Sequence, residues 1–131
     1  MSEHQLPFGT IRIIYEDIAE VVINEAVIMD AKMVAQYHEF LLNHLKAPFS
    51  LLINKINSYS YTFKSQMEIA TLKEINAIAV VVYNKRSKIA TELIASYPRK
   101  EKWNISIFVD CDTALHWLEV EQRPVRKHAK N

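Results

Sequence analysis

One run in the sequence, AIAVVVY at residues 77–83, most constrains the fold, because it is apolar at every position. A strand with one buried face alternates apolar and polar residues, whereas a strand covered on both faces reads as a continuous apolar run. The run is far too short to cross a bilayer, for which a helix needs about 20 residues. It therefore predicts a central strand of a layered α/β domain and no membrane span.

The remaining segments alternate between strand and helix patterns. Strands are predicted at residues 10–16, 18–24, 49–54, 77–83 and 105–109. Helices are predicted at residues 31–46, 63–75, 84–96 and 113–120, with caps at Asp30, Asn84 and Asp112. The join at Asp17 is so short that the first two strands must form an antiparallel hairpin. We therefore expect an α/β fold with a mixed five-stranded sheet, the first strand antiparallel and the rest parallel, and four helices.

The chain shows no linker, repeat or low-complexity segment, so residues 1–131 are predicted to form a single domain. Its core is expected at about residues 9–120. Residues 121–131 are polar and basic and are predicted to be a frayed, solvated tail. The tail carries Arg123, Arg126, Lys127 and Lys130.

Glycine is scarce, and the scarcity excludes one large class of sites. A chain of this length would ordinarily carry about nine glycines, but Gly9 is the only one. Phosphate-cradling loops need glycine so that the backbone can approach the anion, so Walker and dinucleotide motifs are excluded. The net charge of +1 gives no indication of a nucleic-acid partner. Cys111 is the only cysteine and residues 1–7 show no signal-peptide pattern, so we expect a cytoplasmic protein.

The order of elements, the run AIAVVVYN and the closing segment IFVDCDTALHWLEV resemble the SpoIIAA-like proteins of the STAS superfamily. In that group an acidic turn and an Ala-Leu-x-Trp-Leu-like helix follow the final strand. The matching positions are Asp110, Asp112, Ala114, Leu115, Trp117 and Leu118. The resemblance covers about residues 9–120. It implies a STAS/SpoIIAA-like fold and a bacterial, non-enzymatic regulatory module that binds a ligand or a protein without a cofactor.

The resemblance also implies a regulatory turn after the third strand. Anti-anti-sigma factors carry a phosphorylatable serine there, in an Asp-Ser-Ser-Gly-like turn. This chain instead has a segment without aspartate or glycine, here named the tyrosine loop: Asn57, Ser58, Tyr59, Ser60, Tyr61 and Thr62. Two alternatives therefore stand beside the leading interpretation. One is a carrier or sensor of a small apolar, lipid-like molecule, and the other is a phosphorylation-controlled antagonist of an anti-sigma factor.

Residues with catalytic or metal-binding chemistry form no motif. His38 and His44 are six positions apart, which places them about 120° from each other around a helix, so no metal site is expected. Cys111 lies between Asp110 and Asp112, whose charges disfavour a thiolate. The two aspartates end a strand and could hold a cation, but capping of the next helix explains them better. We therefore expect no catalytic residues and no enzyme activity.

The tyrosine loop is the candidate ligand- or partner-binding site. It follows a core strand, at the edge where open α/β sheets bind ligands. Tyr59 and Tyr61 offer apolar faces with polar tips, which suit recognition at a partly wet surface. The start of the next helix, at residues 63–66, is expected to border the same surface, since its free N–H groups favour an anion or a carbonyl. We expect constitutive binding of a protein or a small apolar ligand there.

The strands predict a second contact as well. Several of them are apolar on both faces, so both faces of the sheet need cover. Right-handed crossovers that all step the same way would place most helices on one face. We therefore expect a homodimer partner, another protein, a ligand or a displaced helix to cover the other face.

Overall fold

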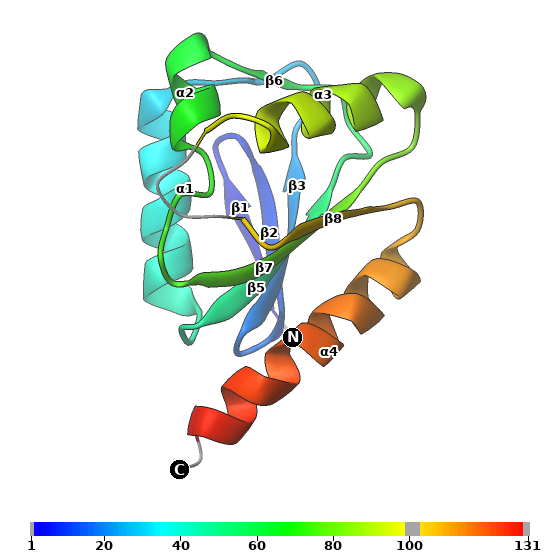
Figure 1. The fold of residues 1–131 in the computed structure, drawn as a ribbon. Helices are drawn as coiled ribbons and strands as arrows, with labels where there is room; N and C mark the ends of the chain where they lie inside the picture. The colour runs from blue at the N-terminus through cyan, green and yellow to red at the C-terminus, as the bar shows by residue number, and fades with distance from the viewer. Residues whose placement is uncertain (1, 99–102, 130–131) are drawn as a thin grey trace.

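The computed structural model describes residues 2–98 and 103–129 and contains a six-stranded sheet with helices on both faces (Figure 1). Along the sheet the strands are β1 (Ser2–Leu6), β2 (Gly9–Tyr15), β3 (Ile18–Ile23), β5 (Phe49–Asn54), β7 (Ile75–Val81) and β8 (Ile105–Phe108). The first three pair antiparallel, and β3, β5, β7 and β8 pair parallel. A separate parallel pair joins β4 (Ile28–Met29) to β6 (Ser60–Tyr61).

The α/β class, the mixed sheet and the hairpin at Asp17 are confirmed, but the predicted number of strands is wrong. The sheet has six strands because β1 adds an outer antiparallel strand that the sequence pattern did not indicate. Its residues SEHQL lack apolar alternation, and only His4 and Leu6 are half-buried. An edge strand with water on most of its surface does not need that alternation.

The four helices are α1 (Ala31–His44), α2 (Phe63–Glu68), α3 (Lys85–Ala95) and α4 (Cys111–Ala129). Asp30, Thr62 and Asn84 cap the first three, each accepting a hydrogen bond from a backbone N–H at the helix start. Helix α2 is shorter than predicted. It ends at Glu68 with Ile69 as its C-cap, and Ala70 then adopts a left-handed conformation with φ of 55°, which turns the chain away.

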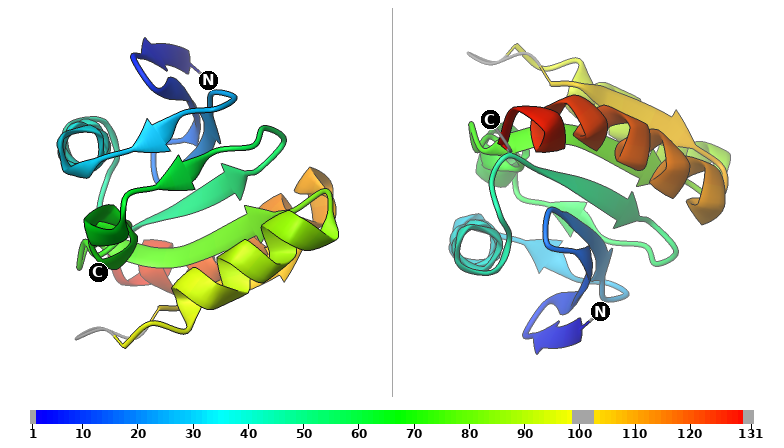
Figure 2. Two further views of the ribbon diagram at one scale, coloured as in Figure 1. Left: turned by 90° about the horizontal axis from the view of Figure 1, so that it is seen from above. Right: turned by 90° about the horizontal axis from the view of Figure 1, so that it is seen from below.

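The central run behaves as its composition predicts, since residues 77–82 are buried throughout. Side chains of β7 alternate between the two faces. Ile78 and Val80 pack in the core on the α1 side, and Ala77, Ala79 and Val81 pack in the core under α4. Figure 2 shows α4 running along one side of the sheet, with α1 on the other side.

Helix α4 covers the second face of the sheet, so of the covers expected there the helix is the one that the structure shows. Ala114 and Leu118 are fully buried against Ile18, Leu52 and the alanines of β7. The alanines let the helix approach the sheet closely. This removes the main reason to expect a dimer or partner contact on that face, although dimerisation itself stays a prediction.

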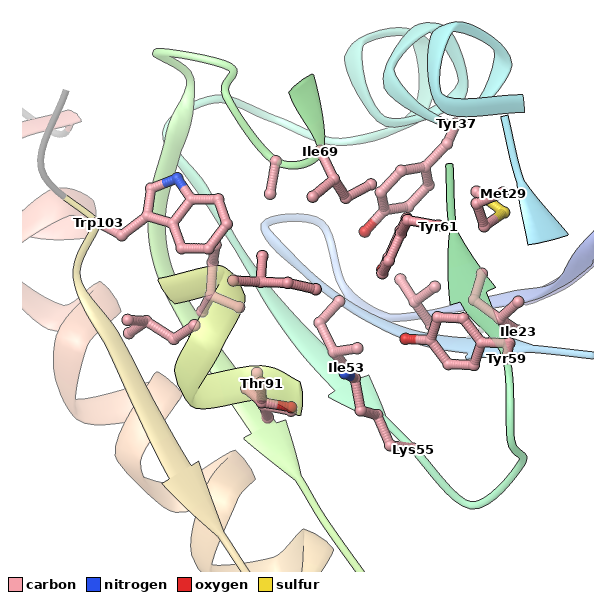
Figure 3. Close-up of a pocket in the computed structure, with 16 residues that line it drawn as sticks. Ile23, Met29, Tyr37, Ile53, Lys55, Tyr59, Tyr61, Ile69, Thr91 and Trp103 are labelled. Carbon is pink, nitrogen blue, oxygen red and sulfur yellow. The ribbon is translucent and has the colours of Figure 1, made fainter. Parts of the chain in front are cut away.

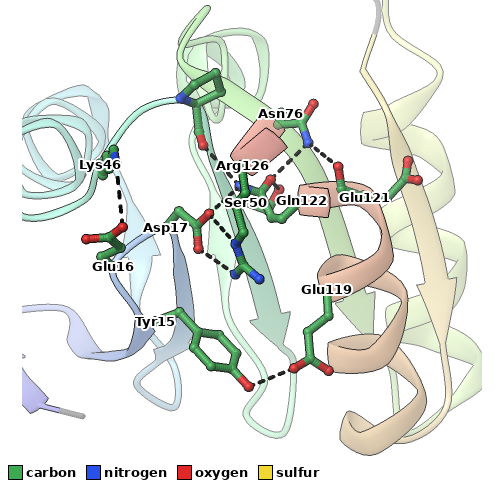
Figure 4. A network of polar contacts seen from close by, with 11 residues as sticks. Tyr15, Glu16, Asp17, Lys46, Ser50, Asn76, Glu119, Glu121, Gln122 and Arg126 are labelled. Atoms are coloured by element: carbon green, nitrogen blue, oxygen red, sulfur yellow. Dashed lines mark hydrogen bonds and ion pairs between the residues drawn. The ribbon is translucent and has the colours of Figure 1, made fainter. Parts of the chain in front are cut away.

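The prediction of a frayed tail after residue 120 is wrong, because α4 continues to Ala129. Gln122 is fully buried, and Arg126 donates two hydrogen bonds to the carboxylate of Asp17, at 2.9 and 2.8 Å (Figure 4). Gln122 also donates to Asp17, at 3.0 Å, and accepts from Ser50 and Asn76. Burial alone would raise the pKa of Asp17, but these hydrogen bonds from Arg126 and Gln122 hold it below its usual value.

Helix α3 lies differently from the amphipathic pattern that the sequence suggests. Ile89, Leu93 and Ile94 are predicted to point inward, but Ile89 and Leu93 are each 55% exposed. Ile94 packs against the core as predicted, and Thr91 faces the sheet beside it, with its hydroxyl donating to the Ser87 carbonyl one turn earlier. None of the helices in the described residues is long and apolar enough to cross a membrane.

Candidate ligand-binding site

The tyrosine loop is tied to the β3–α1 connection at several points. The Asn57 side-chain amide donates to the carbonyl of Ile23, and the Ser58 backbone N–H donates to the Glu25 carboxylate, at 2.9 and 2.8 Å. The Ala26 N–H in turn donates to the carbonyl of Ser58. These contacts, with the β4–β6 pairing, hold the loop in a fixed position at the carboxyl end of β5.

The six predicted residues separate into distinct roles. Thr62 caps α2, and its hydroxyl hydrogen-bonds that of Ser65, so it is structural. Ser58 and Ser60 are exposed. Tyr59 and Tyr61 turn inward, with ring centroids 5.6 Å apart in an edge-to-face contact. At the start of α2, Phe63 is 82% exposed.

The two tyrosines form part of the wall of an apolar pocket with a volume of about 50 Å³ (Figure 3). Its floor is the α1-side face of β3, β5, β7 and β8, and its remaining walls come from α1, the segment after α2, and α3. The residues that line it are Val21, Ile23, Met29, Tyr37, Ile53, Lys55, Tyr59, Tyr61, Ile69, Ala70, Ile78, Val80, Thr91, Ile94, Trp103 and Ile105. The pocket thus lies under the loop that the sequence singles out.

Two polar groups face into this apolar space. The hydroxyl of Tyr59 is buried and has no hydrogen-bond partner in the described part of the chain. Lys55 extends from the end of β5, with its ammonium nitrogen 5.5 Å from the centre of the Tyr59 ring. In Figure 3 the nitrogen of Lys55 and the hydroxyl of Tyr59 both point inward, toward Ile53.

The electrostatics of the pocket follow from its lack of water. Burial lowers the pKa of Lys55 to about 8, because an ammonium group loses hydration there. Burial also raises the pKa of Tyr37, Tyr59 and Tyr61, so all three stay neutral at physiological pH. Among the described residues that line it, the pocket therefore has one cation and three neutral phenols.

An open cleft lies on the outer side of the same loop. Tyrosine-loop residues, the N-terminus of α3 and the basic side chains of Lys85 and Arg86 line it. Lys55 and Tyr59 line both the cleft and the pocket, and no other described residue is common to the two. They therefore mark the boundary between the apolar interior and the basic cleft.

The other candidate residues do not form a site. The predicted cap at Asp112 is wrong: Asp110 caps α4, and its carboxylate accepts a hydrogen bond from the Thr113 N–H at 2.8 Å. Cys111 lies 3.7 Å from the Tyr83 hydroxyl. His38 accepts from the Ala70 N–H, whereas His44 is exposed and stacks on Phe40. Within residues 2–98 and 103–129, no group of His, Cys, Asp or Glu side chains is placed to hold a metal ion.

The chain matches no protein-family model, no curated protein and no solved structure. The resemblance to SpoIIAA-like proteins therefore remains a prediction.

Sequence reasoning missed the residues that complete the pocket. Tyr37, Thr91 and Trp103 come from three separate parts of the chain, and nothing in their local pattern relates them. Lys55 had one usable signal, since it directly follows a core strand, where side chains reach the binding edge of an α/β sheet.

The desolvated lysine predicts an unusual pH dependence of stability. Because the pKa of Lys55 is about 8 in the folded protein and 10.5 ordinarily, the unfolded chain binds more protons between these values, and stability rises with pH. Above pH 10 the buried tyrosines, whose pKa values are raised by folding, reverse the trend. Urea unfolding at pH 7.5, 8.5 and 9.5 measures the rise, which is worth about 1.4 kcal/mol per unit of pKa difference. Lys55→Met should remove it, whereas Lys88→Met, on an exposed lysine, should keep it.

Proposed function

We propose that the chain is a non-enzymatic binding module that carries or senses a small apolar molecule in the pocket beneath the tyrosine loop. The supporting observation is the pocket itself. Protein interiors hold few voids larger than a water molecule, and a water needs about 10–15 Å³ of such space. The cavity of about 50 Å³ exceeds this several-fold, and at Lys55 and Tyr59 it reaches the carboxyl edge of the sheet, where ligands bind in α/β proteins.

Two strained backbone positions support the proposal. Ala26 and Ala70 have φ of 65° and 55°, a left-handed conformation that alanine rarely adopts. Such positions cost about 1–3 kcal/mol and occur preferentially at ligand-binding sites. Ala26 lines the cleft and Ala70 lines the pocket, so both lie at the proposed site.

The proposal includes the expectations drawn from the family resemblance. We propose a divergent SpoIIAA-like domain of the STAS superfamily, supported by the hairpin followed by alternating strands and helices. A cytoplasmic location is supported by a cysteine that is unpaired in the described structure. A protein partner or homodimer would bind outside the pocket, and the exposed residues of the tyrosine loop, Ser58 and Ser60, are the proposed contacts.

The tyrosines provide the direct test. Hexanol, a neutral apolar probe, is expected to bind the wild-type protein and to shift amide NMR resonances of the tyrosine loop, of Ala70 and of Ile94. Tyr59→Ala combined with Tyr61→Ala removes two walls of the pocket. We expect that variant to bind hexanol about tenfold more weakly or worse, because each ring loses apolar contact area with the ligand.

Phe63→Ala is the matched control, since it removes an aromatic ring next to the loop but outside the pocket. It should leave hexanol affinity unchanged. Equal hexanol affinity in the wild type and in a folded double-tyrosine variant would show that hexanol binds outside this pocket. Native mass spectrometry of protein purified from its own host would then show whether any small molecule copurifies.

One observation favours the phosphorylation-controlled alternative. Ser58 and Ser60 are exposed and line the same cleft as Lys85 and Arg86, which could pair with a phosphate. Against it, the Ser58 N–H donates to the Glu25 carboxylate, and that negative charge disfavours a phosphate on the same residue. Stoichiometric phosphate on either serine in host-purified protein would favour this second function over constitutive binding.

A further inference from the structure

The chemistry of the pocket boundary indicates which end group a ligand should carry. Lys55 offers three N–H donors and no acceptor, and Tyr59 offers one O–H donor. In the described structure the Lys55 ammonium makes no hydrogen bond or ion pair, and its only partner is the face of the Tyr59 ring. The Tyr59 hydroxyl is buried and makes no hydrogen bond of normal geometry with any described residue, although the Tyr61 phenol lies close enough to add to the rise in its pKa that burial causes. Two convergent donors at the edge of an apolar space thus lack an acceptor.

Such an arrangement is unfavourable unless something completes it. A buried hydroxyl without a hydrogen bond and a desolvated cation without a counter-ion are both destabilising. Among the described residues that line the pocket or the cleft there is no acidic side chain. The remaining charged side chains at the cleft, Lys85 and Arg86, are cations and cannot accept.

The position of the donors sets the direction of the ligand. Lys55 and Tyr59 lie where the apolar pocket meets the basic cleft. A ligand with its apolar end among Ile78, Val80 and Ile94 would have its other end beside both donors. A carboxylate there would accept from the ammonium and the hydroxyl together and would also sit in the positive potential of the cleft.

We propose that the site binds a short apolar carboxylic acid, with its chain in the pocket and its carboxylate held by Lys55 and Tyr59. This inference rests on the proposed function and adds the chemical class of the ligand. The volume of about 50 Å³ limits the enclosed part to a few non-hydrogen atoms. A longer chain would have to enlarge the pocket by moving the tyrosine loop or Trp103.

The test compares two probes that differ in their end group. We expect hexanoate to bind the wild-type protein at pH 7 about tenfold more tightly than hexanol, because a hydrogen bond to a charged group contributes more than a neutral one. Lys55→Met keeps the apolar stem and should bring hexanoate affinity down to that of hexanol. Tyr59→Phe should weaken hexanoate by about tenfold through loss of one charge-assisted hydrogen bond. Lys88→Met, an exposed lysine on α3 that lines neither space, is the matched control and should change nothing.

A pH series gives a second readout. The pKa of Lys55 is about 8 in the unliganded protein, so hexanoate affinity should fall about tenfold between pH 7 and pH 9 as the ammonium deprotonates. Hexanol affinity should stay constant over that range. The titratable groups that face Lys55 in the pocket are Tyr37, Tyr59 and Tyr61, whose raised pKa values keep them neutral.

The outcomes separate this inference from the proposed function. Equal binding of hexanol and hexanoate in the wild type would overturn the carboxylate assignment and leave an apolar site in place. A preference for hexanoate that persists in Lys55→Met and at pH 9 would also overturn it. If neither probe binds, both proposals fail together.

Discussion

Arg126→Met is expected to destabilise the protein by about 3 kcal/mol, although Arg126 lies in a segment that the sequence predicts to be a solvated tail. The Asp17 side chain is 7% exposed, and Arg126 donates two of the hydrogen bonds that its carboxylate accepts. Removing one partner of a buried ion pair leaves an uncompensated charge, which costs about 3–5 kcal/mol. We expect the lower end of that range because the Arg126 side chain is itself 39% exposed.

Arg123→Met on the same helix is the matched control, since Arg123 is exposed and has no partner among the described contacts. Urea unfolding at equilibrium should show a change below about 0.5 kcal/mol for this variant. Similar costs for the two variants would contradict a structural role for the Asp17–Arg126 pair.

The same pair predicts an inversion in the pH dependence of stability. In the wild type the pKa of Asp17 is lower in the folded protein than in the unfolded chain. Asp17 therefore stabilises the fold at neutral pH, and this stabilisation is lost as the pH falls through the pKa of Asp17 in the folded protein. In Arg126→Met, burial would raise the pKa of Asp17 instead. Stability of that variant, measured relative to wild type, should therefore recover as the pH is lowered toward 4.

Gly9→Ala is expected to lower the free energy of unfolding by about 3 kcal/mol or more, which is at or above the upper end of the range for overpacking a buried site. Gly9 is buried at the start of β2, with partners on both sides, Leu6 in β1 and Ile23 in β3. A Cβ atom at this position would clash with the Val22 carbonyl oxygen and lie 2.9 Å from the Ile23 Cα. Both atoms belong to the backbone of a neighbouring strand, so relief requires β2 and β3 to separate.

Thr10→Ala provides the comparison for Gly9→Ala. Thr10 is the next residue of β2, and its hydroxyl donates to the Gln5 side chain near the surface. Loss of that hydrogen bond should cost about 1 kcal/mol. Thermal or urea unfolding of both variants measures the two losses of stability. A steric role for Gly9 predicts a clearly larger loss in Gly9→Ala, whereas a general sensitivity of β2 to substitution would give equal losses.

The elements predicted well are those in which local pattern and tertiary role agree. The continuous apolar run of β7 is buried on both faces, and the Asp30 and Asn84 caps begin their helices as expected. The elements that failed depend on distant partners. Pro124 and a basic composition obscure the last turns of α4, which are fixed by Asp17 and Ser50, two residues far from α4 in the sequence.

The candidate site likewise has features that follow from local sequence and features that depend on distant residues. The position of the tyrosine loop at the end of a core strand, and the amphipathic character of its tyrosines, follow from sequence. The pocket beneath it does not, because Tyr37, Ile69, Ile94 and Trp103 converge only once α1, α2 and α3 have packed on the sheet. The partnerless state of the Tyr59 hydroxyl is likewise a property of the folded structure alone.

The Asp17–Arg126 pair joins residues 109 positions apart, and this separation has a consequence for synthesis in the cell. Loop closure over such a length must precede the contact, and folding slows as contacts become more distant in sequence. While the ribosome still holds α4, the face of the sheet formed by Ile18, Leu52 and Val81 is open and Asp17 lacks its counter-ion. The nascent chain therefore completes its core only after the last helix emerges, and until then it offers chaperones an apolar sheet face to bind.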